Sequence, residues 1–175
     1  MIEINNLTTK KVNEDFLKKI AQKVLKEEGK EKSDLSIALI GQGRMRKLNK
    51  RYRGKNRVTD VLAFGENQIP NGARSGGTPT PPPPFRSPRA PRAGDGLSSH
   101  FRIPKSLKGF GEVVICLREV KKNAKRFKST FKKELATCLI HGILHLLGYN
   151  DEKDEITAKK MEEKQNYYLA QLDFV

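Results

Sequence analysis

The sequence has few cysteines, and their positions exclude the common cysteine-based sites. Cys116 and Cys138 are the only two among 175 residues. Both lie in apolar stretches, they form no C-x-x-C pair, and their spacing to the histidines does not suit a structural zinc site. We therefore expect two small, buried side chains without a disulfide, as in a protein of a reducing compartment.

Long apolar runs are also missing. No window approaches the roughly 20 consecutive apolar residues that a membrane-spanning helix needs. Residues 1–9 lack the charged start and apolar centre of a secretory signal peptide. We therefore expect a cytoplasmic protein that has no membrane partner.

Acidic residues are in deficit, because 35 Lys and Arg stand against 20 Asp and Glu and the formal net charge is +15. A strongly positive field attracts phosphate backbones and speeds encounters with them. Net charge alone does not distinguish a nucleic-acid partner from an anionic membrane surface. Since the apolar segments of a membrane protein are missing, we expect a nucleic-acid partner.

Proline is absent from most of the chain, because all nine prolines lie within residues 67–108. A segment so rich in Pro, Gly, Ser and Arg cannot bury enough apolar surface to offset the entropy of ordering it. We therefore predict one domain over residues 1–175, interrupted by a disordered insertion at 67–108. The insertion is interpreted first as a tolerated surface segment and second as an additional RNA-contacting arm.

The rest of the chain alternates strand and helix patterns. Apolar alternation or apolar runs predict strands at residues 1–4, 35–40, 61–64 and 112–117, the last two neighbouring in space. Helical spacing and capping residues predict five helices. The first follows Asn13 and ends near Gly29, and the second follows a Gly41-Gln42-Gly43 turn with Met45, Leu48 and Tyr52 on its inner side. The third runs through Val120, Ala124 and Phe127, and the fourth follows Ser129 or Thr130. The fifth follows Asp154, with Ile156, Met161, Tyr168 and Leu172 on its inner side. We therefore predict an α+β fold, in which one small mixed sheet of about four strands packs with about five helices.

The fourth predicted helix is apolar on nearly every side, which is typical of a central, buried helix. It carries His141 and His145, and this spacing places both imidazoles on one helix face with Cβ atoms roughly 5–6 Å apart. Gly148 can end the helix in a left-handed conformation, so that Asp151 turns back as a third ligand. Two histidines and one carboxylate leave a coordination position open, as in catalytic zinc sites.

Two alternatives to a zinc site follow from the same residues. Iron(II), nickel or manganese also accept imidazole and carboxylate ligands. A purely structural cluster would leave two buried imidazoles without partners, at a cost of roughly 1–3 kcal/mol each. A zinc peptidase of the H-E-x-x-H type needs a glutamate after its first histidine, where this chain has Gly142. A metal-assisted hydrolysis other than peptide cleavage is therefore favoured.

The segment His141-Gly142-x-Leu144-His145-Leu146-Leu147-Gly148-Tyr149 is similar to the signature of the YbeY family of zinc-dependent endoribonucleases. Further similar motifs occur in the family's order at residues 48–49, 52–55, 59–64 and 111–115, so that the resemblance covers the chain apart from the insertion. The family usually ends this signature with Gly-Tyr-Asp-His, whereas Asn150 and Asp151 occupy the last two positions here. A carboxylate as the third ligand adds negative charge at the metal and should raise the pKa of bound water. The alternative third ligand is His100, which lies in the insertion.

The resemblance implies a single-strand-type, metal-dependent endoribonuclease with one Zn²⁺, or another divalent transition metal, per chain. His141 and His145 would be catalytic together with Arg53, whose guanidinium can hold a phosphate bidentately. The alternative for Arg53 is a solvated side chain of a basic cluster. RNA phosphates would contact Lys50, Arg51, Arg53, Lys55 and Arg57.

The resemblance also implies a role in ribosomal RNA maturation and ribosome quality control, with ribosomal RNA and the ribosome as partners. Thr59 and Asp60 are expected to fix the turn into the third strand. A second hypothesis is a ribosome-associated RNA-binding protein whose catalysis is impaired by Asp151. A divergent metallopeptidase is the third, and Gly142 disfavours it.

Overall fold

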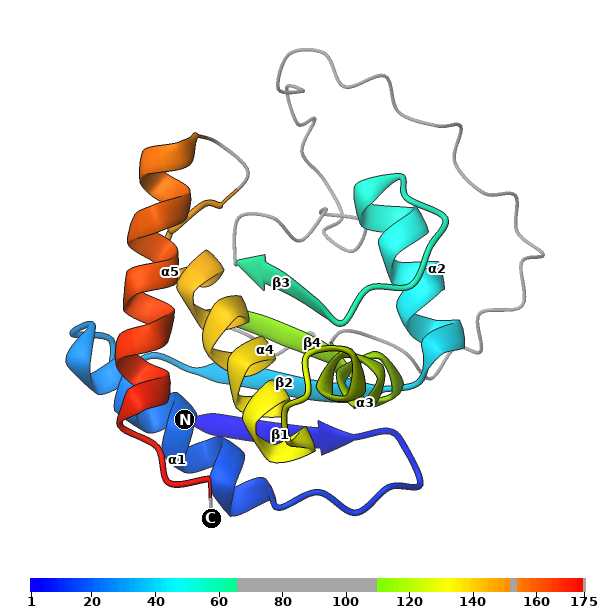
Figure 1. The fold of residues 1–175 in the computed structure, drawn as a ribbon, viewed down its shortest axis with the longest axis horizontal. Coiled ribbons are helices and arrows are strands. Elements are labelled where there is room, and N and C mark those ends of the chain that lie inside the picture. The colour runs from blue at the N-terminus through cyan, green and yellow to red at the C-terminus, as the bar shows by residue number, and fades with distance from the viewer. Residues whose placement is uncertain (66–109, 152–153, 175) are drawn as a thin grey trace, which may run out of the picture.

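The computed structural model describes residues 1–65, 110–151 and 154–174. The elements within these ranges are β1 (Ile2–Asn6), α1 (Glu14–Glu27), β2 (Leu35–Ile40), α2 (Gln42–Arg53), β3 (Val61–Gly65), β4 (Gly111–Cys116), α3 (Leu117–Arg126), α4 (Phe131–Leu146) and α5 (Glu155–Ala170). The described residues thus form five helices and a four-stranded sheet (Figure 1), which confirms the predicted α+β class. The predicted disorder of 67–108 concerns residues that all lie outside the described ranges.

The sheet is mixed, as expected. Its strands follow the order β1-β2-β4-β3, with β1, β2 and β4 parallel and β3 antiparallel to β4. The register pairs Gly65 at the end of β3 with Gly111 at the start of β4. The strands that flank the Pro-rich segment are therefore neighbours, as the sequence predicted.

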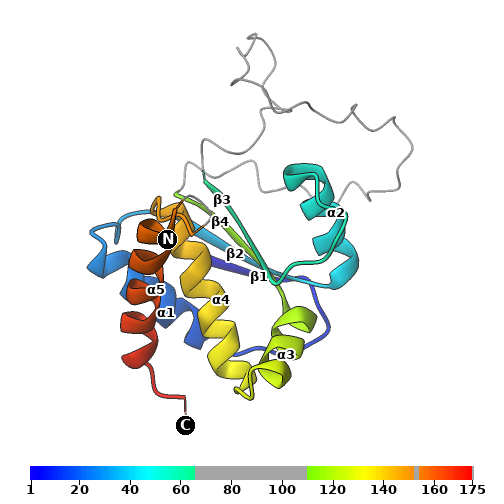
Figure 2. The same ribbon diagram turned by 45° about the horizontal axis from the view of Figure 1, so that its top comes forward.

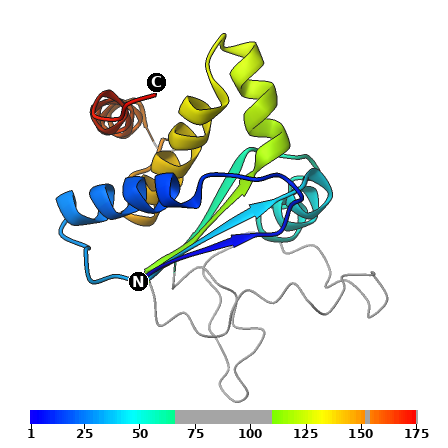
Figure 3. The same cartoon turned by 90° about the horizontal axis from the view of Figure 1, so that it is seen from below.

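The two faces of the sheet have separate apolar clusters. Leu35, Ile37 and Leu39 of β2 point into the larger cluster with α1, α3, α4 and α5, whereas Ala38 and Ile40 point into a smaller one with α2. Figure 3 shows the sheet edge-on, with α1, α4 and α5 on one side. Because helices cover both faces, every residue of β2 and β4 is buried.

A carboxylic acid lies within this buried sheet. Glu112 of β4 is only 3% exposed, pairs in register with Ser36 of β2 and forms a side-chain hydrogen bond with it. Its Oε2 has no hydrogen-bond partner among the described residues. Burial raises the pKa of Glu112 from 4.5 to about 7, so the protonated form is favoured in slightly acidic solution.

Helix α4 is the central helix of the larger cluster, as predicted. It contacts α1, α3, α5, β3 and β4. Thr130 caps its start, because the Thr130 hydroxyl accepts a hydrogen bond from the Lys133 amide at 3.1 Å. Eight of its residues are buried, and in Figure 2 it lies between α5 and α3.

Some element details differ from the predictions. Helix α2 already begins at Gln42 with Gly41 as its cap, and Leu117 opens α3 instead of ending β4. Phe127 follows the end of α3 and is 59% exposed. Ile156 is 69% exposed, so its predicted inward position is wrong. Ile156 lies five positions before buried Met161, which turns it about 140° off the packed face of α5.

The cysteine and membrane expectations can be checked on the same residues. Cys116 and Cys138 are free and buried, as predicted. Among the described helices, none is both long and apolar enough to cross a membrane.

Candidate metal centre

The two histidines of α4 face each other one helical turn apart. Their Nε2 atoms are 3.0 Å apart and their ring centroids 4.6 Å apart. Both side chains are about one-third exposed, at 28% for His141 and 32% for His145. The predicted pairing on one helix face is confirmed, and the pair is open to solvent.

The chain after α4 returns toward the histidines through a turn at Gly148. Its φ of +96° lies in a region that glycine adopts without steric cost. The Gly148 amide donates to the carbonyl of His145 at 3.0 Å, and the Tyr149 amide to that of Leu144 at 3.1 Å. These two bonds form a Schellman motif, so the predicted role of Gly148 is confirmed.

The turn brings Asp151 to the histidines. Its Oδ1 lies 3.4 Å from His145 Nε2 and its Oδ2 lies 3.7 Å from His141 Nε2. The three residues each offer one ligand atom, and these atoms lie within 4.8 Å of one another. The predicted third member of the cluster is therefore in reach, whereas the alternative His100 lies outside the described residues.

The far nitrogen of each imidazole has a partner that fixes the ring. His141 Nδ1 lies 3.1 Å from Oε1 of Gln165 on α5, and His145 Nδ1 lies 3.1 Å from the carbonyl oxygen of Tyr149. Both partners are acceptors, so they favour the tautomer with the proton on Nδ1 and a free lone pair on Nε2. Metal-binding histidines in proteins are commonly held in this way.

Electrostatics at the site also favours a bound cation. Burial lowers the pKa of His145, the charges of His141 and Arg53 act in the same direction, and Asp151 opposes them. Neutral imidazole is the form that ligates metals. In these tautomers two nitrogen lone pairs face each other at 3.0 Å beside a carboxylate. A divalent cation fits this donor set because it would offset that repulsion, and the donors alone do not fix which metal it is.

Arg53 is the last residue of α2, and Gly54 ends this helix with a φ of +68°. The positive charge of Arg53 contributes to lowering the pKa of His145. The remaining residues of the predicted RNA-binding cluster are exposed near the end of the same helix, namely Lys50, Arg51, Lys55 and Arg57. The charge of Arg53 thus acts on a predicted metal ligand, and the other cations of the cluster are exposed in the same part of the chain.

Asn49 of α2 holds the loop that carries part of this cluster. Its side chain is buried, and its Nδ2 donates to the carbonyl of Arg57 at 2.7 Å. The backbone between Gly54 and Arg57 is therefore tied to α2 while its basic side chains face solvent.

Asp60 serves the fold, as expected. Its carboxylate accepts hydrogen bonds from the Val61 amide at 2.9 Å, the Asn123 amide group at 3.0 Å and the Thr59 hydroxyl at 3.2 Å. These bonds fix the entry into β3 and tie it to α3. The predicted structural role of Thr59 and Asp60 is confirmed.

Gly142 has a packing role that the sequence did not reveal. A Cβ atom at this position would lie 2.6 Å from Cγ1 of Val113 and 3.2 Å from Cγ2 of Val61. Helix α4 thus packs closely against the sheet beside the first histidine. A glutamate at position 142, which a peptidase of the H-E-x-x-H type requires, would collide with β4.

Glu28, just after α1, anchors the loop and helix around the centre. It accepts hydrogen bonds from the hydroxyl of Tyr168 at 2.6 Å, from Lys164 Nζ at 2.8 Å and from the hydroxyl of Tyr149 at 3.5 Å. Burial raises the pKa of Glu28, but these bonds outweigh it and the pKa is lowered. The ionised carboxylate therefore links α1, α5 and the turn after α4.

Gln165, the Tyr149 carbonyl and Glu28 were not among the predicted site residues. Gln165 lies 24 positions from His141, and no motif or spacing between the two helices links these residues. The Tyr149 carbonyl belongs to the backbone, so the residue type gives no signal. Only the apolar pattern of α5, which buries Met161 and Tyr168, indicates the face on which Gln165 lies.

Comparison with known proteins gives a consistent answer over the whole chain. The model of the family "Endoribonuclease YbeY" matches residues 3–173. An endoribonuclease YbeY of Petrotoga mobilis is 32% identical over 170 residues, covering 97% of this chain and 92% of that protein. One of a Sulfurihydrogenibium species is 30% identical over 164 residues, covering 94% and 86%.

A solved structure shares the fold. The solution structure of TM1509 from Thermotoga maritima aligns with a TM-score of 0.56 and 27% identity, covering 98% of this chain and 88% of that one. The expectation of an enzyme, a hydrolase that acts on RNA, is thereby confirmed at the level of the family. With its two histidines and Asp151 gathered at the end of α4, the chain belongs to the endoribonuclease YbeY family.

Proposed function

We propose that this chain is a metal-dependent endoribonuclease that cleaves single-stranded RNA in ribosomal RNA maturation and ribosome quality control. The observation that carries the proposal is the cluster of His141, His145 and Asp151, whose ligand atoms lie within 4.8 Å of one another in a member of an endoribonuclease family. The basic cluster beside it supports RNA as the substrate.

His141, His145 and Asp151 would hold one divalent cation, for which we propose Zn²⁺ or another divalent transition metal. Such an ion, when bound, activates water and polarises a phosphodiester. The protein contributes the orientation of the ligands. Gln165 and the Tyr149 carbonyl hold the two rings through Nδ1, so that both Nε2 atoms face the same space.

Arg53 supplies the fixed positive charge of the site. A guanidinium can hold two oxygens of a phosphate and stabilise the negative charge that develops in the transition state. Lys50, Arg51 and Arg53 all lie in the last turn of α2. The phosphate held by Arg53 would therefore belong to a backbone that Lys50 and Arg51 also contact. Phosphate contacts of this kind give affinity without base selection. Ribosomal RNA and the ribosome are the partners that we propose on the basis of the family resemblance.

Asp151 favours a second candidate function. A carboxylate stands where the family usually has its third histidine, and it is 39% exposed. An anionic ligand lowers the electrophilicity of the metal, and weaker activation of water would leave an RNA-binding protein with impaired catalysis. A metallopeptidase is disfavoured because position 142 has no room for the general base.

The test combines metal content with RNA cleavage. The purified protein should contain close to one equivalent of metal per chain and should cut single-stranded segments of ribosomal RNA, and a chelator should abolish both. The His145→Ala variant should lose cleavage and most of its metal. Asp151→Asn should bind metal less tightly, whereas Glu155→Gln, an equal charge change at an exposed position of α5, should match the wild type. Cleavage that survives both chelation and His145→Ala contradicts the mechanism, and metal binding without cleavage supports the second candidate.

A further inference from the structure

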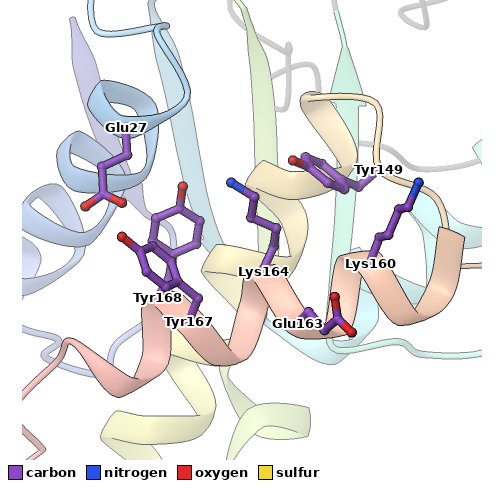
Figure 4. A pocket seen from close by; sticks show the side chains of 7 residues that line it. All are labelled: Glu27, Tyr149, Lys160, Glu163, Lys164, Tyr167 and Tyr168. Atoms are coloured by element: carbon purple, nitrogen blue, oxygen red, sulfur yellow. The ribbon is translucent and has the colours of Figure 1, made fainter. Parts of the chain in front are cut away.

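A cavity of about 680 Å³ lies beside the metal centre, between the end of α1 and the outer face of α5. This volume is in the range of small-molecule pockets in proteins. Tyr149, Lys160 and Tyr167 are among its lining residues. In the view of Figure 4, Tyr149 lies between the amino ends of Lys160 and Lys164.

The cavity and the metal centre share a wall. The side chain of Tyr149 lines the cavity, while its carbonyl oxygen lies 3.1 Å from Nδ1 of His145. On α5, Lys164 lines the cavity and the next residue, Gln165, contacts Nδ1 of His141 at 3.1 Å. Glu163 and Tyr167 stand two positions before and after Gln165 and so lie on the opposite side of α5, roughly 10 Å across the helix. A strand whose phosphodiester lies at the metal could therefore place a base in the cavity a few nucleotides away.

Tyr167 offers an exposed ring for stacking. It is 53% exposed, although tyrosine is a large and mainly apolar side chain. The buried ring of Tyr168 meets it edge to face, with centroids 5.2 Å apart and planes at 73°. Tyr167 is thus supported from one side while part of its surface remains open, which is the arrangement of an aromatic platform for a base.

The charges of the cavity favour a neutral ring over a phosphate. The Lys164 ammonium lies 2.8 Å from Glu28, so that its charge is already compensated. Among the remaining charged lining residues, the single positive charge of Lys160 is outnumbered by the carboxylates of Glu27 and Glu163. This excess of negative charge repels a phosphate, whereas carboxylates accept hydrogen bonds from the amino groups of bases.

We propose that this cavity binds one base of the RNA strand, a few nucleotides from the phosphodiester at the metal centre, and prefers bases with an exocyclic amino group. Tyr167 stacks on the base, and Glu27 and Glu163 accept from its amino group. Cytosine, adenine and guanine are therefore favoured over uracil. The inference rests on the proposed endoribonuclease function, because it assigns the cavity to the same RNA strand.

The test measures binding of labelled oligocytidylate and oligouridylate of equal length, in chelator so that no cleavage occurs. Tyr167→Ala should weaken oligocytidylate binding about tenfold, the typical value of one stacked base. Tyr167→Phe keeps the ring and should bind like the wild type. Phe127→Ala removes an aromatic ring of similar exposure, 59%, from the end of α3 and serves as the matched control.

Two further measurements separate a base site from a general effect. Tyr167→Ala should leave the slope of log affinity against log salt unchanged, because stacking releases no counterions. Glu163→Gln should reduce the preference for oligocytidylate over oligouridylate several-fold, because an amide also donates to uracil. If the wild type binds and cleaves RNA but Tyr167→Ala equals it in affinity, the cavity assignment fails alone. If the wild type neither binds nor cleaves RNA, the proposed function fails and the cavity assignment fails with it.

Discussion

Replacing Gly142 with alanine tests whether close packing of α4 positions the metal ligands. The added Cβ would lie 2.6 Å from Cγ1 of Val113, a side chain with 0% exposure. Valine is branched at Cβ and has few rotamers available, so it cannot swing away from the contact. Restoring an ordinary carbon–carbon separation of about 3.5 Å requires α4 and the sheet to move apart by roughly 1 Å.

Two opposing effects set the stability of Gly142→Ala. Alanine is favoured over glycine inside a helix by about 1 kcal/mol. Overpacking a well-filled core costs roughly 1–3 kcal/mol. Overpacking should therefore prevail, with a net loss of about 1 kcal/mol in the free energy of unfolding. Activity should fall further, because a displacement of about 1 Å relative to Arg53 can cost on the order of 100-fold in rate.

Urea unfolding and RNA cleavage of matched variants distinguish these effects. Gly43→Ala is the control, because Gly43 also lies in a helix and a Cβ there has no neighbour within 4 Å. It should raise stability by up to about 1 kcal/mol. Val113→Ala in the Gly142→Ala background should recover part of the activity and give a favourable coupling energy in a double-mutant cycle. A Gly142→Ala protein that is as stable and as active as the wild type would refute the packing argument.

Three further predictions concern stability, RNA affinity and the metal. Because the folded-state pKa of Glu112 is raised from 4.5 to about 7, its contribution to stability is fully present below pH 4.5 and is lost as the pH rises through 7. Glu112→Gln should therefore match the wild type in urea unfolding at pH 4.5 and exceed it by about 3 kcal/mol at pH 9; equal differences at both pH values would contradict this. Exchanging Lys50 and Lys55 for alanine should weaken RNA binding and flatten its salt dependence. The control exchanges Lys10 and Lys11, which follow the edge strand β1. Equal salt slopes for the two double variants would contradict an RNA contact at Lys50 and Lys55. Asp151→His replaces an anionic ligand by a neutral one, so the rising limb of the pH–rate profile should move to lower pH; a shift to higher pH would argue that Asp151 does not ligate the metal.

The local parts of the site were predictable from sequence because they depend on residues close together in the chain. The histidine spacing, the left-handed turn at Gly148 and the return of Asp151 lie within a short stretch and follow from helix geometry. Strand pairing on either side of residues 67–108 followed from the apolar runs that flank them.

The parts that depend on tertiary contacts were not predictable. Gly142 was interpreted only as a missing base, because the sequence does not show that Val113 lies opposite. Ile156 was placed inside because its spacing is compatible with a helix, but the packed face of α5 is set by Met161 and Tyr168. The contact of Gln165 with His141 depends on how two helices cross, and residue spacing carries no such information.

The pairing of Gly65 with Gly111 has a consequence for engineering. The sheet itself holds together the two ends of the connection between β3 and β4. Doubling the length of a flexible connection adds only about 0.6 kcal/mol of closure entropy. A reporter domain whose termini lie close together could therefore be spliced into this connection, or new chain termini opened there in a circular permutant, without breaking the helix that carries the histidines.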